Sequence, residues 1–471
     1  AGGGAACLPL PVEGASSNSQ PESGEDGPRE WMTVVGVTIC LFCIHCQPSE
    51  AYLTKYLRDD KGISEAALDQ QVWPVDTWTQ LATLLPLGLL AEVVGYRPVA
   101  IFGLLCRLAT RLLLIWGGGI RQMAVMQALY AMGTNTDVIM LTLMYMAVPP
   151  TSFRAVTGLA FAAKHAGSFL GAGVGQAMAD DEPGNLRRLF FVSLGFTISG
   201  LATFVAMARR PTRKPPVALA TLIATKGVPE TWAIVQRLYQ KGVVRRWAAW
   251  YLFAQSITDL VLNYYQNQVE DADSKAKLGY FQMLLEFCGV CGVAAASGVA
   301  PKVVAWPTTV VVSTSFAIAC GYLVALDNPS SLDAVCVGNA ISFGLALFAA
   351  TVASYTVAAA VTSAGPSEGI ARDTVGAVHR DAVTVKGGIA AKHVNAEREM
   401  HSAEDSRYSV IFACNGTLAL AWASVISAIG TADQWGTADF YRAGVIQLFA
   451  YAASALLFEG LLQCLRYARV E

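Results

Sequence analysis

Long apolar stretches recur along the whole chain and restrict it to a membrane-spanning helical fold. Only 14% of its 471 residues are charged, whereas soluble domains carry about 25%. A helix needs about 20 largely apolar residues to cross a bilayer, and the sequence offers twelve such stretches. They fall at 31–57, 72–94, 98–118, 122–148, 154–179, 188–208, 247–268, 277–299, 303–326, 333–362, 408–430 and 441–465. We therefore predict an all-α, multi-pass integral membrane protein embedded in a lipid bilayer.

A strongly basic segment divides these stretches into two sets of six. Residues 209–246 contain nine basic side chains against a single acid, Glu230. Basic residues concentrate in cytoplasmic loops, so we expect a basic cytoplasmic linker here and both termini on the cytoplasmic side. Two six-helix halves, 31–208 and 247–471, joined by a long linker are the layout of the major facilitator type. In that type, substrate binds between two halves that rock against each other.

Two polar regions lie outside the apolar stretches. Residues 1–30 are rich in Gly, Pro, Ser and acidic side chains, and they lack the basic start and short apolar core of a secretory signal. We expect this region to be a disordered N-terminal tail. Residues 362–407 have mixed charge and several Gly and Ala residues. We expect a flexible cytoplasmic insertion there and assign no chemistry to it.

The cysteines and histidines form no pattern that predicts a metal site. Two cysteine pairs have C-x-x-C spacing, but neither has a second pair or histidines at zinc-like spacing. No nucleophile–base pair appears in the sequence either. We therefore predict no enzyme, no cofactor and no metal, and nothing in the sequence suggests nucleic-acid binding.

One predicted span carries a regular series of glycines. Gly167, Gly171 and Gly175 recur every four residues, so they share one face of the helix at 154–179. Small residues in such a series allow two helix backbones to approach closely. We predict a packing role for this face.

Acidic residues lie inside or at the edge of several predicted spans, where a charge is costly and usually functional. Glu50 follows Pro48, which removes a backbone hydrogen-bond donor and predicts a break in the first helix. Asp76 and Asp137 lie in the second and fourth spans. We expect these carboxylates to mark a binding site or a transport pathway.

Other acidic residues have a structural explanation beside the functional one. Glu50 itself can pair with Lys55. Asp259 in the seventh span fits a site and a packing partner equally well. Glu286 in the eighth span fits an ion-pair partner or a coupling carboxylate better than a substrate ligand.

The link between the second and third spans is short and charged. Residues 91–98 contain Glu92, then Gly95, then Arg97. This link lies where the major facilitator superfamily carries an acidic-Gly-basic gating motif. We therefore expect Glu92 and Arg97 to act in gating at the cytoplasmic face.

Several short sequence blocks occur in a fixed order along the first eight spans. They are Pro48-Ser49-Glu50-x-Tyr52-Leu53-Thr54-x-Tyr56-Leu57, Trp73-Pro74-Val75-x-Thr77, Tyr96-Arg97-Pro98-Val99, Met123-x-x-Met126-Gln127-x-x-Tyr130, Trp247-x-x-Trp250 and Val261-Leu262-Asn263-Tyr264-x-Gln266. This series resembles the reduced folate carrier and thiamine transporter family. The resemblance implies uptake of a vitamin across a membrane, with the plasma membrane as the expected location.

The resemblance also bears on which vitamin is carried. Folate carriers of the family have an arginine in the middle of span four, whereas the thiamine branch has an acid, and Asp137 matches the acid. The block Asn263-Tyr264-x-Gln266 is similar to the thiamine branch as well. There, Asn and Gln hydrogen-bond an aminopyrimidine edge and the tyrosine offers its ring face to a cation.

Two positions depart from the thiamine branch. Gln127 stands where animal thiamine carriers use a carboxylate, although the neighbouring Tyr130 is kept. Asp76 stands where that branch has a stacking tryptophan, and Trp78 lies two residues further on. Asp76 therefore adds negative charge and removes a stacking surface, unless Trp78 supplies one.

We therefore expect a secondary-active carrier of thiamine or a related organic cation. In this reading negative charge comes from Glu50, Asp76 and Asp137, hydrogen bonds from Gln127, Asn263 and Gln266, and ring faces from Tyr130 and Tyr264. A carboxylate that alternately binds a proton and the substrate would couple the flux to a proton or counter-ion.

Two alternatives stay open. Arg107 and Lys164 lie at a depth comparable to that of Asp137. A pair with either base would neutralise Asp137 and weaken the argument for a cation. If the two bases instead line the cavity unpaired, a reduced folate or another anionic vitamin is expected. The other alternative is a transport-inactive nutrient sensor on the same fold.

Overall fold

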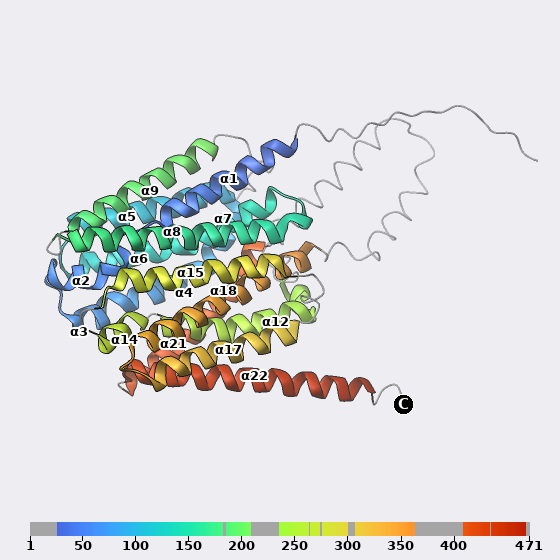
Figure 1. Cartoon of the computed structure of the whole chain (residues 1–471). Coiled ribbons are helices and arrows are strands. Elements are labelled where there is room, and N and C mark those ends of the chain that lie inside the picture. The colour runs from blue at the N-terminus through green and yellow to red at the C-terminus, as the bar shows by residue number, and fades with distance from the viewer. Residues whose placement is uncertain are drawn as a thin grey trace, which may run out of the picture.

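The protein, described here by a computed structural model, is a bundle of long helices that run side by side (Figure 1). The structure describes residues 26–181, 185–208, 235–262, 264–273, 276–299, 307–362, 408–433 and 435–467. All regular elements in these ranges are helical, which confirms the predicted all-α class. Most of the predicted N-terminal tail, basic linker and insertion 362–407 lies outside the described residues.

The first half begins at the same end of the bundle where the last helix finishes (Figure 1). Its elements are α1 (Asp26–His45), η1 (Glu50–Tyr52), α2 (Leu53–Asp59), α3 (Glu65–Ala67), η2 (Leu68–Val72), α4 (Trp73–Val94), α5 (Tyr96–Trp116), α6 (Gly119–Asn135), α7 (Asp137–Met146), η3 (Pro150–Ser152), α8 (Phe153–Asp181) and α9 (Arg187–Ala208).

The second half repeats this pattern of long helices interrupted by short ones. Its elements are α12 (Gly242–Trp250), η4 (Tyr251–Gln255), α13 (Ser256–Leu262), α14 (Tyr265–Ala272), α15 (Leu278–Gly298), α17 (Pro307–Asp327), α18 (Leu332–Thr362), α21 (Tyr408–Ala432) and α22 (Thr437–Tyr467).

Eight helices among the described residues are long and apolar enough to cross a membrane. They are Trp31–Asp59, Tyr96–Trp116, Arg187–Met207, Leu278–Gly298, Pro307–Asp327, Leu332–Val361, Val410–Gly430 and Thr437–Leu461. This establishes an integral, multi-pass membrane protein. The remaining predicted spans, 72–94, 122–148, 154–179 and 247–268, are also largely helical, but the total of twelve crossings stays a prediction.

The first helix breaks where the proline predicted it. Helix α1 ends at His45, the chain turns through Pro48 without helical pairing, and the short helix η1 begins at Glu50. The turn is closed by a hydrogen bond in which the Glu50 N–H donates to the Gln47 carbonyl at 3.1 Å. Glu50 therefore lies at a helix break, where its side chain can leave the direction of α1.

The glycine series on α8 lies directly against the end of α1. A Cβ atom on Gly171 would lie 2.5 Å from the backbone nitrogen of Gln47, and Cβ atoms on Gly167 and Gly175 would overlap backbone atoms of Phe42 and Pro48. Only hydrogen at these positions permits this approach. The predicted close-contact face is confirmed, and it fixes the broken end of α1 against α8.

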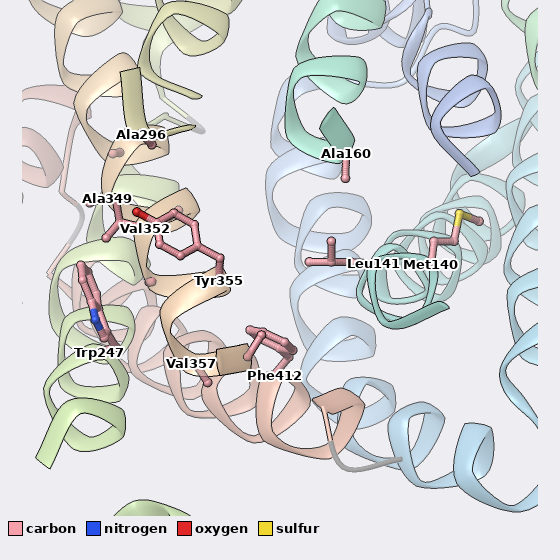
Figure 2. Packing of buried hydrophobic residues seen from close by; sticks show 14 of the residues in the cluster. Met140, Leu141, Ala160, Trp247, Ala296, Ala349, Val352, Tyr355, Val357 and Phe412 are labelled. Atoms are coloured by element: carbon pink, nitrogen blue, oxygen red, sulfur yellow. The ribbon is translucent and has the colours of Figure 1, made fainter. Parts of the chain in front are cut away.

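The two halves meet along two helix pairs. Helix α8 packs on α15, as Figure 1 shows, and α4 packs on α21. A single buried cluster contains side chains of both halves, including Leu141 and Ala160 on one side and Tyr355 and Phe412 on the other (Figure 2). The rings of Tyr145 and Phe412 stack across this contact, with centroids 6.3 Å apart. Apolar packing thus joins the halves.

Candidate functional site

Asp137 is surrounded by three nitrogen-bearing side chains. Its Oδ1 accepts a hydrogen bond from Arg107 Nη2 at 2.8 Å, and its Oδ2 lies 3.0 Å from His45 Nε2 and 3.5 Å from Lys164 Nζ. The side chain of Arg107 is 3% exposed and that of Asp137 is 15% exposed. The structure therefore confirms that Arg107, Asp137 and Lys164 share one depth.

This cluster lies inside the first half, where α1, α5, α7 and α8 meet. Its single carboxylate faces two strong bases, so the charge of Asp137 is already balanced by its neighbours. The ion-pair alternative considered for Asp137 is the one the geometry favours. Negative charge for a cationic ligand must come from other residues.

Glu50 pairs with a different base from the one expected. Its carboxylate lies 3.6 Å from Arg111 Nη2 on α5, not against Lys55. Arg111 is buried and also donates a hydrogen bond to the Gln47 side chain, just before the helix break. The Glu50 side chain remains 40% exposed. Its contact with Arg111 therefore leaves part of the carboxylate accessible.

Asp76 has no ion-pair partner among the described residues. It lies in the first turn of α4, where Gln80 Nε2 donates to its Oδ2 at 2.8 Å. Its Oδ1 is buried and has no hydrogen-bond partner in the described structure. A buried carboxylate oxygen without a donor is costly. A bound donor or cation would remove that cost.

The predicted span-four residues lie close to these acids. Tyr130 on α6 is within electrostatic reach of Glu50, Asp76 and Arg111. Gln127 lies almost one turn earlier on the same helix and is buried. These interactions place Glu50, Asp76 and Tyr130 near one another, and Gln127 lies on the same helix as Tyr130, in the middle of α6.

Trp78 does not simply replace the missing stacking surface at Asp76. Its side chain is exposed, and a step of two residues along a helix rotates it by about 200°. Asp76 and Trp78 therefore lie on nearly opposite sides of α4.

The second half contributes a separate group of polar residues. Tyr264 precedes α14, and one face of its ring stacks on Phe440, with centroids 4.3 Å apart and an angle of 12° between the rings. Gln266 is half-buried in the first turn of α14. Asn263, the third residue predicted here, lies outside the described residues. The stacked Phe440 leaves at most one Tyr264 face for a ligand.

Asp259 on α13 is a second acid without an ion-pair partner among the residues that the structure describes. Its Oδ1 accepts a hydrogen bond from Gln255 Nε2 at 2.7 Å, and the residue is exposed. Lys164 of the first half acts on it electrostatically. Asp259 is therefore within electrostatic reach of the first half. It follows a π-helical segment, η4, and such segments occur frequently at functional sites.

The predicted gating residues lie at the turn between α4 and α5. Gly95 has a φ of 100°, which glycine adopts readily, and it allows α5 to start directly after α4. The Tyr96 hydroxyl donates to Glu92 at 2.5 Å. Arg97 lines a small cavity together with Leu143 and Phe204. The structure describes these residues but does not test their predicted role.

Sequence reasoning missed one member of the cluster. His45 ends α1 and contacts Asp137 across 92 positions of sequence. The sequence offers only a weak signal, a polar residue within an apolar run just before Pro48. Glu286 was expected to be an ion-pair partner or a coupling carboxylate, and the structure places its Oε2 2.7 Å from His165 Nδ1.

The sequence of the whole chain matches a known family. The model of the family described as reduced folate carrier covers residues 29–214 and 221–365, which is more than half of the chain. The chain belongs to the reduced folate carrier family. This result agrees with the resemblance seen in the ordered sequence blocks.

Relatives of this family member carry different vitamin names. Human thiamine transporter 2 is 35% identical over 141 residues, which make up 28% of this chain and 28% of that protein. Folate-like transporter 3 of Caenorhabditis elegans is 23% identical over 252 residues, or 49% of this chain and 59% of that protein. The human reduced folate transporter is 26% identical over 199 residues, or 40% and 33%. The chain thus spans between 28% and 59% of the length of these relatives.

A solved structure supports the architecture. The crystal structure of the human organic anion transporter MFSD10 superposes with a TM-score of 0.56, covering 93% of this chain and 99% of that chain. The sequences are 14% identical. At this identity the likeness shows a shared fold and carries no information on the substrate.

Proposed function

We propose that this family member is a secondary-active carrier of the major facilitator type that moves thiamine or a related organic cation. Its two six-helix halves would alternate between outward-open and inward-open states, with twelve membrane crossings in total. The family match supports the carrier class. The expected location is the plasma membrane.

The single observation that carries the choice of a cation is the unpaired carboxylate of Asp76. It lies beside Tyr130 and Glu50, and no basic side chain among the described residues neutralises it. In a low-dielectric cavity an uncompensated acid attracts a cation strongly. A bound thiazolium-like charge would also supply the missing partner for its buried oxygen.

The wider charge balance points in the same direction. The candidate site residues and their ion-pair partners include four acids, Glu50, Asp76, Asp137 and Asp259, and three bases, Arg107, Arg111 and Lys164. With His45 neutral, this set has one negative charge in excess. The two acids without an ion-pair partner among the described residues, Asp76 and Asp259, carry two negative charges, one in each half, and the second base beside Asp137 offsets one of them. A cation between the halves would therefore interact favourably with both.

The remaining residues have the roles that the resemblance implies. Tyr130 and Tyr264 would offer their rings to those of the ligand, while Gln127, Asn263 and Gln266 would bind its polar edge. Asp137 would act through its contacts with Arg107 and Lys164 by holding these bases away from the ligand. Glu92 and Arg97 would belong to the cytoplasmic gate.

One observation favours an anionic vitamin such as a reduced folate. The cluster around Asp137 contains two strong bases for one carboxylate, and Lys164 is 35% exposed. This local positive charge would suit a carboxylate of a folate. The anionic carrier is therefore the second candidate.

Uptake by purified protein in liposomes separates these candidates. We expect labelled thiamine to accumulate inside the vesicles, excess unlabelled thiamine to block it and excess reduced folate to leave it unchanged. Block by folate together with folate accumulation would establish the anionic carrier instead. Saturable thiamine binding without accumulation would identify a sensor and contradict the carrier.

A further inference from the structure

A buried histidine–glutamate pair joins the two halves. His165 Nδ1 on α8 lies 2.7 Å from Glu286 Oε2 on α15, and the side chains are only 9% and 8% exposed. The two residues are 121 positions apart and belong to different halves. This pair takes no part in the proposed substrate site.

The surroundings enclose the pair and leave it little access to water. Gln282 Nε2 donates to the second oxygen of Glu286 at 2.8 Å, and the Tyr265 hydroxyl donates to the side-chain oxygen Oε1 of Gln282. The ring of Phe343 on α18 meets His165 edge-on, with centroids 5.5 Å apart. Glu286 Oε1 has its donor, Gln282, on the same helix, whereas Oε2 has its partner, His165, only as long as the halves stay together.

Other titratable groups near the pair are directed elsewhere. On α8 the preceding residue, Lys164, turns toward Asp137, which also holds His45 of α1. From the second half, Tyr265 faces Glu286, and the charge of Glu50 on η1 also reaches this tyrosine. Phe343, which comes from α18, is not titratable. His165 is thus the nitrogen base in contact with Glu286 among the described residues.

Separation of the halves would leave this carboxylate in an unfavourable state. Removing one partner of a buried ion pair is strongly destabilising because the remaining charge stays buried without compensation. A protonated, neutral carboxyl group avoids that cost. When the contact between α8 and α15 opens, Glu286 Oε2 loses its partner His165, and a proton on this oxygen would take the place of the lost contact.

We propose that His165 and Glu286 form a proton-binding site that couples proton movement to the motion of the halves. This inference rests on the proposed carrier function. With the contact closed, the imidazole N–H donates to the Glu286 carboxylate. As the contact opens, Glu286 takes up one proton from water, and it releases this proton when the contact forms again. No covalent bond to carbon changes, and one proton is bound and released in each cycle.

The His165–Glu286 pair and the Asp137 cluster are separate sites that share helix α8. Lys164 and His165 are consecutive on α8, so their side chains leave the helix about 100° apart. Lys164 points into the first half and His165 crosses to the second. A shift of α8 on α15 therefore affects the Asp137 cluster and the proton site together.

The test compares wild type with Glu286→Gln, which imitates the protonated state and keeps the shape of the side chain. In liposomes, thiamine uptake by wild type should change by up to about tenfold per pH unit, the limit for one titrating group. Glu286→Gln should lose this dependence but retain exchange of labelled for unlabelled thiamine at equal pH. Asp180→Asn, at another contact of α8 with α15, is the matched control and should keep the wild-type pH profile.

A second measurement keeps the two proposals distinguishable. Hydrogen exchange of α8 and α15 should depend on pH in wild type and lose that dependence in both Glu286→Gln and His165→Gln, whatever the substrate. Absence of thiamine exchange in wild type, with this pH response intact, would reject the substrate and keep the proton site. An unchanged pH response of Glu286→Gln, in uptake or in hydrogen exchange, would overturn the proton site.

Discussion

Arg107 connects the two pieces of the broken fourth span through Asp137. Its Nη2 donates to the Asp137 carboxylate at 2.8 Å, and its Nε donates to the carbonyl of Gly133 at 3.3 Å. Gly133 lies in the last turn of α6, and Asp137 is the first residue of α7. The Arg107 guanidinium group thus holds the end of α6 and the start of α7 together. Asp137 therefore has a structural role in addition to any role in binding.

Replacing Asp137 with Asn should therefore destabilise the protein. The substitution leaves the buried Arg107 without its counter-charge, a change that typically costs about 3–5 kcal/mol. We expect a clear fall in the thermal unfolding temperature of the protein in detergent. The double variant Arg107→Gln/Asp137→Asn should recover much of this loss, because it removes both charges. Equal stability of Asp137→Asn and wild type would show that the contact contributes nothing.

Replacing Asp76 with Asn should weaken cation transport without harming the fold. Asp76 has no ion-pair partner to abandon among the described residues, and Asn keeps the hydrogen-bonding shape. We expect the KM for thiamine to rise about tenfold, which corresponds to about 1.4 kcal/mol of lost attraction. Asp59→Asn, at an exposed acid that ends α2, is the control and should transport normally. An unchanged KM in Asp76→Asn would remove this residue from the site.

Joining residues 180 and 277 should stop transport. Lys277 Nζ donates to Asp180 Oδ2 at 3.0 Å, which links α8 of one half to the start of α15 in the other. With cysteine at both positions, a short bifunctional thiol reagent should block thiamine uptake, and cleavage of the linker should restore it. Each single cysteine variant should remain active after the same treatment. Full uptake by the linked protein would show that these ends do not separate during the cycle.

The glycine face of α8 should tolerate no side chain. In Gly171→Ala the new methyl group would lie 2.5 Å from the backbone nitrogen of Gln47, and overpacking of this kind costs about 1–3 kcal/mol. Gly195→Ala is the matched control, because nothing lies within 4 Å of a Cβ atom there. Alanine in that open helical position should stabilise the protein by about 0.5–1 kcal/mol. Thermal unfolding should move the two variants in opposite directions, and a common shift would contradict the packing argument.

The sequence predicts the helices well because the bilayer imposes one simple requirement, a run of about 20 apolar residues. Where a helix meets this requirement on its own, as at 98–118, prediction and structure agree closely. The four ranges that do not meet it contain site residues, among them Asp76, Tyr130 and Lys164. Polar residues that serve a site reduce the hydropathy from which a span is recognised.

Side-chain contacts could be predicted from the sequence only between neighbouring helices, where counting residues from the helix ends gives the depth of each side chain. Arg107 and Asp137 lie on consecutive spans, and counting from the helix ends placed them together correctly. Glu50 lies just after the break at Pro48, and the direction of its side chain toward Arg111 depends on the shape of that turn. The pairing of His165 with Glu286 depends on how the two halves dock, which no local pattern in the sequence records.

The bare backbone contact between α1 and α8 determines which parts of this molecule can move. At Gly167, Gly171 and Gly175 no side chain separates the backbone of α8 from the backbone around the end of α1. Neither segment can therefore slide along the other without a collision of main-chain atoms. We therefore expect α1 and α8 to move together as one rigid body. In the proposed carrier cycle the movement between the halves therefore takes place elsewhere, where α8 packs on α15.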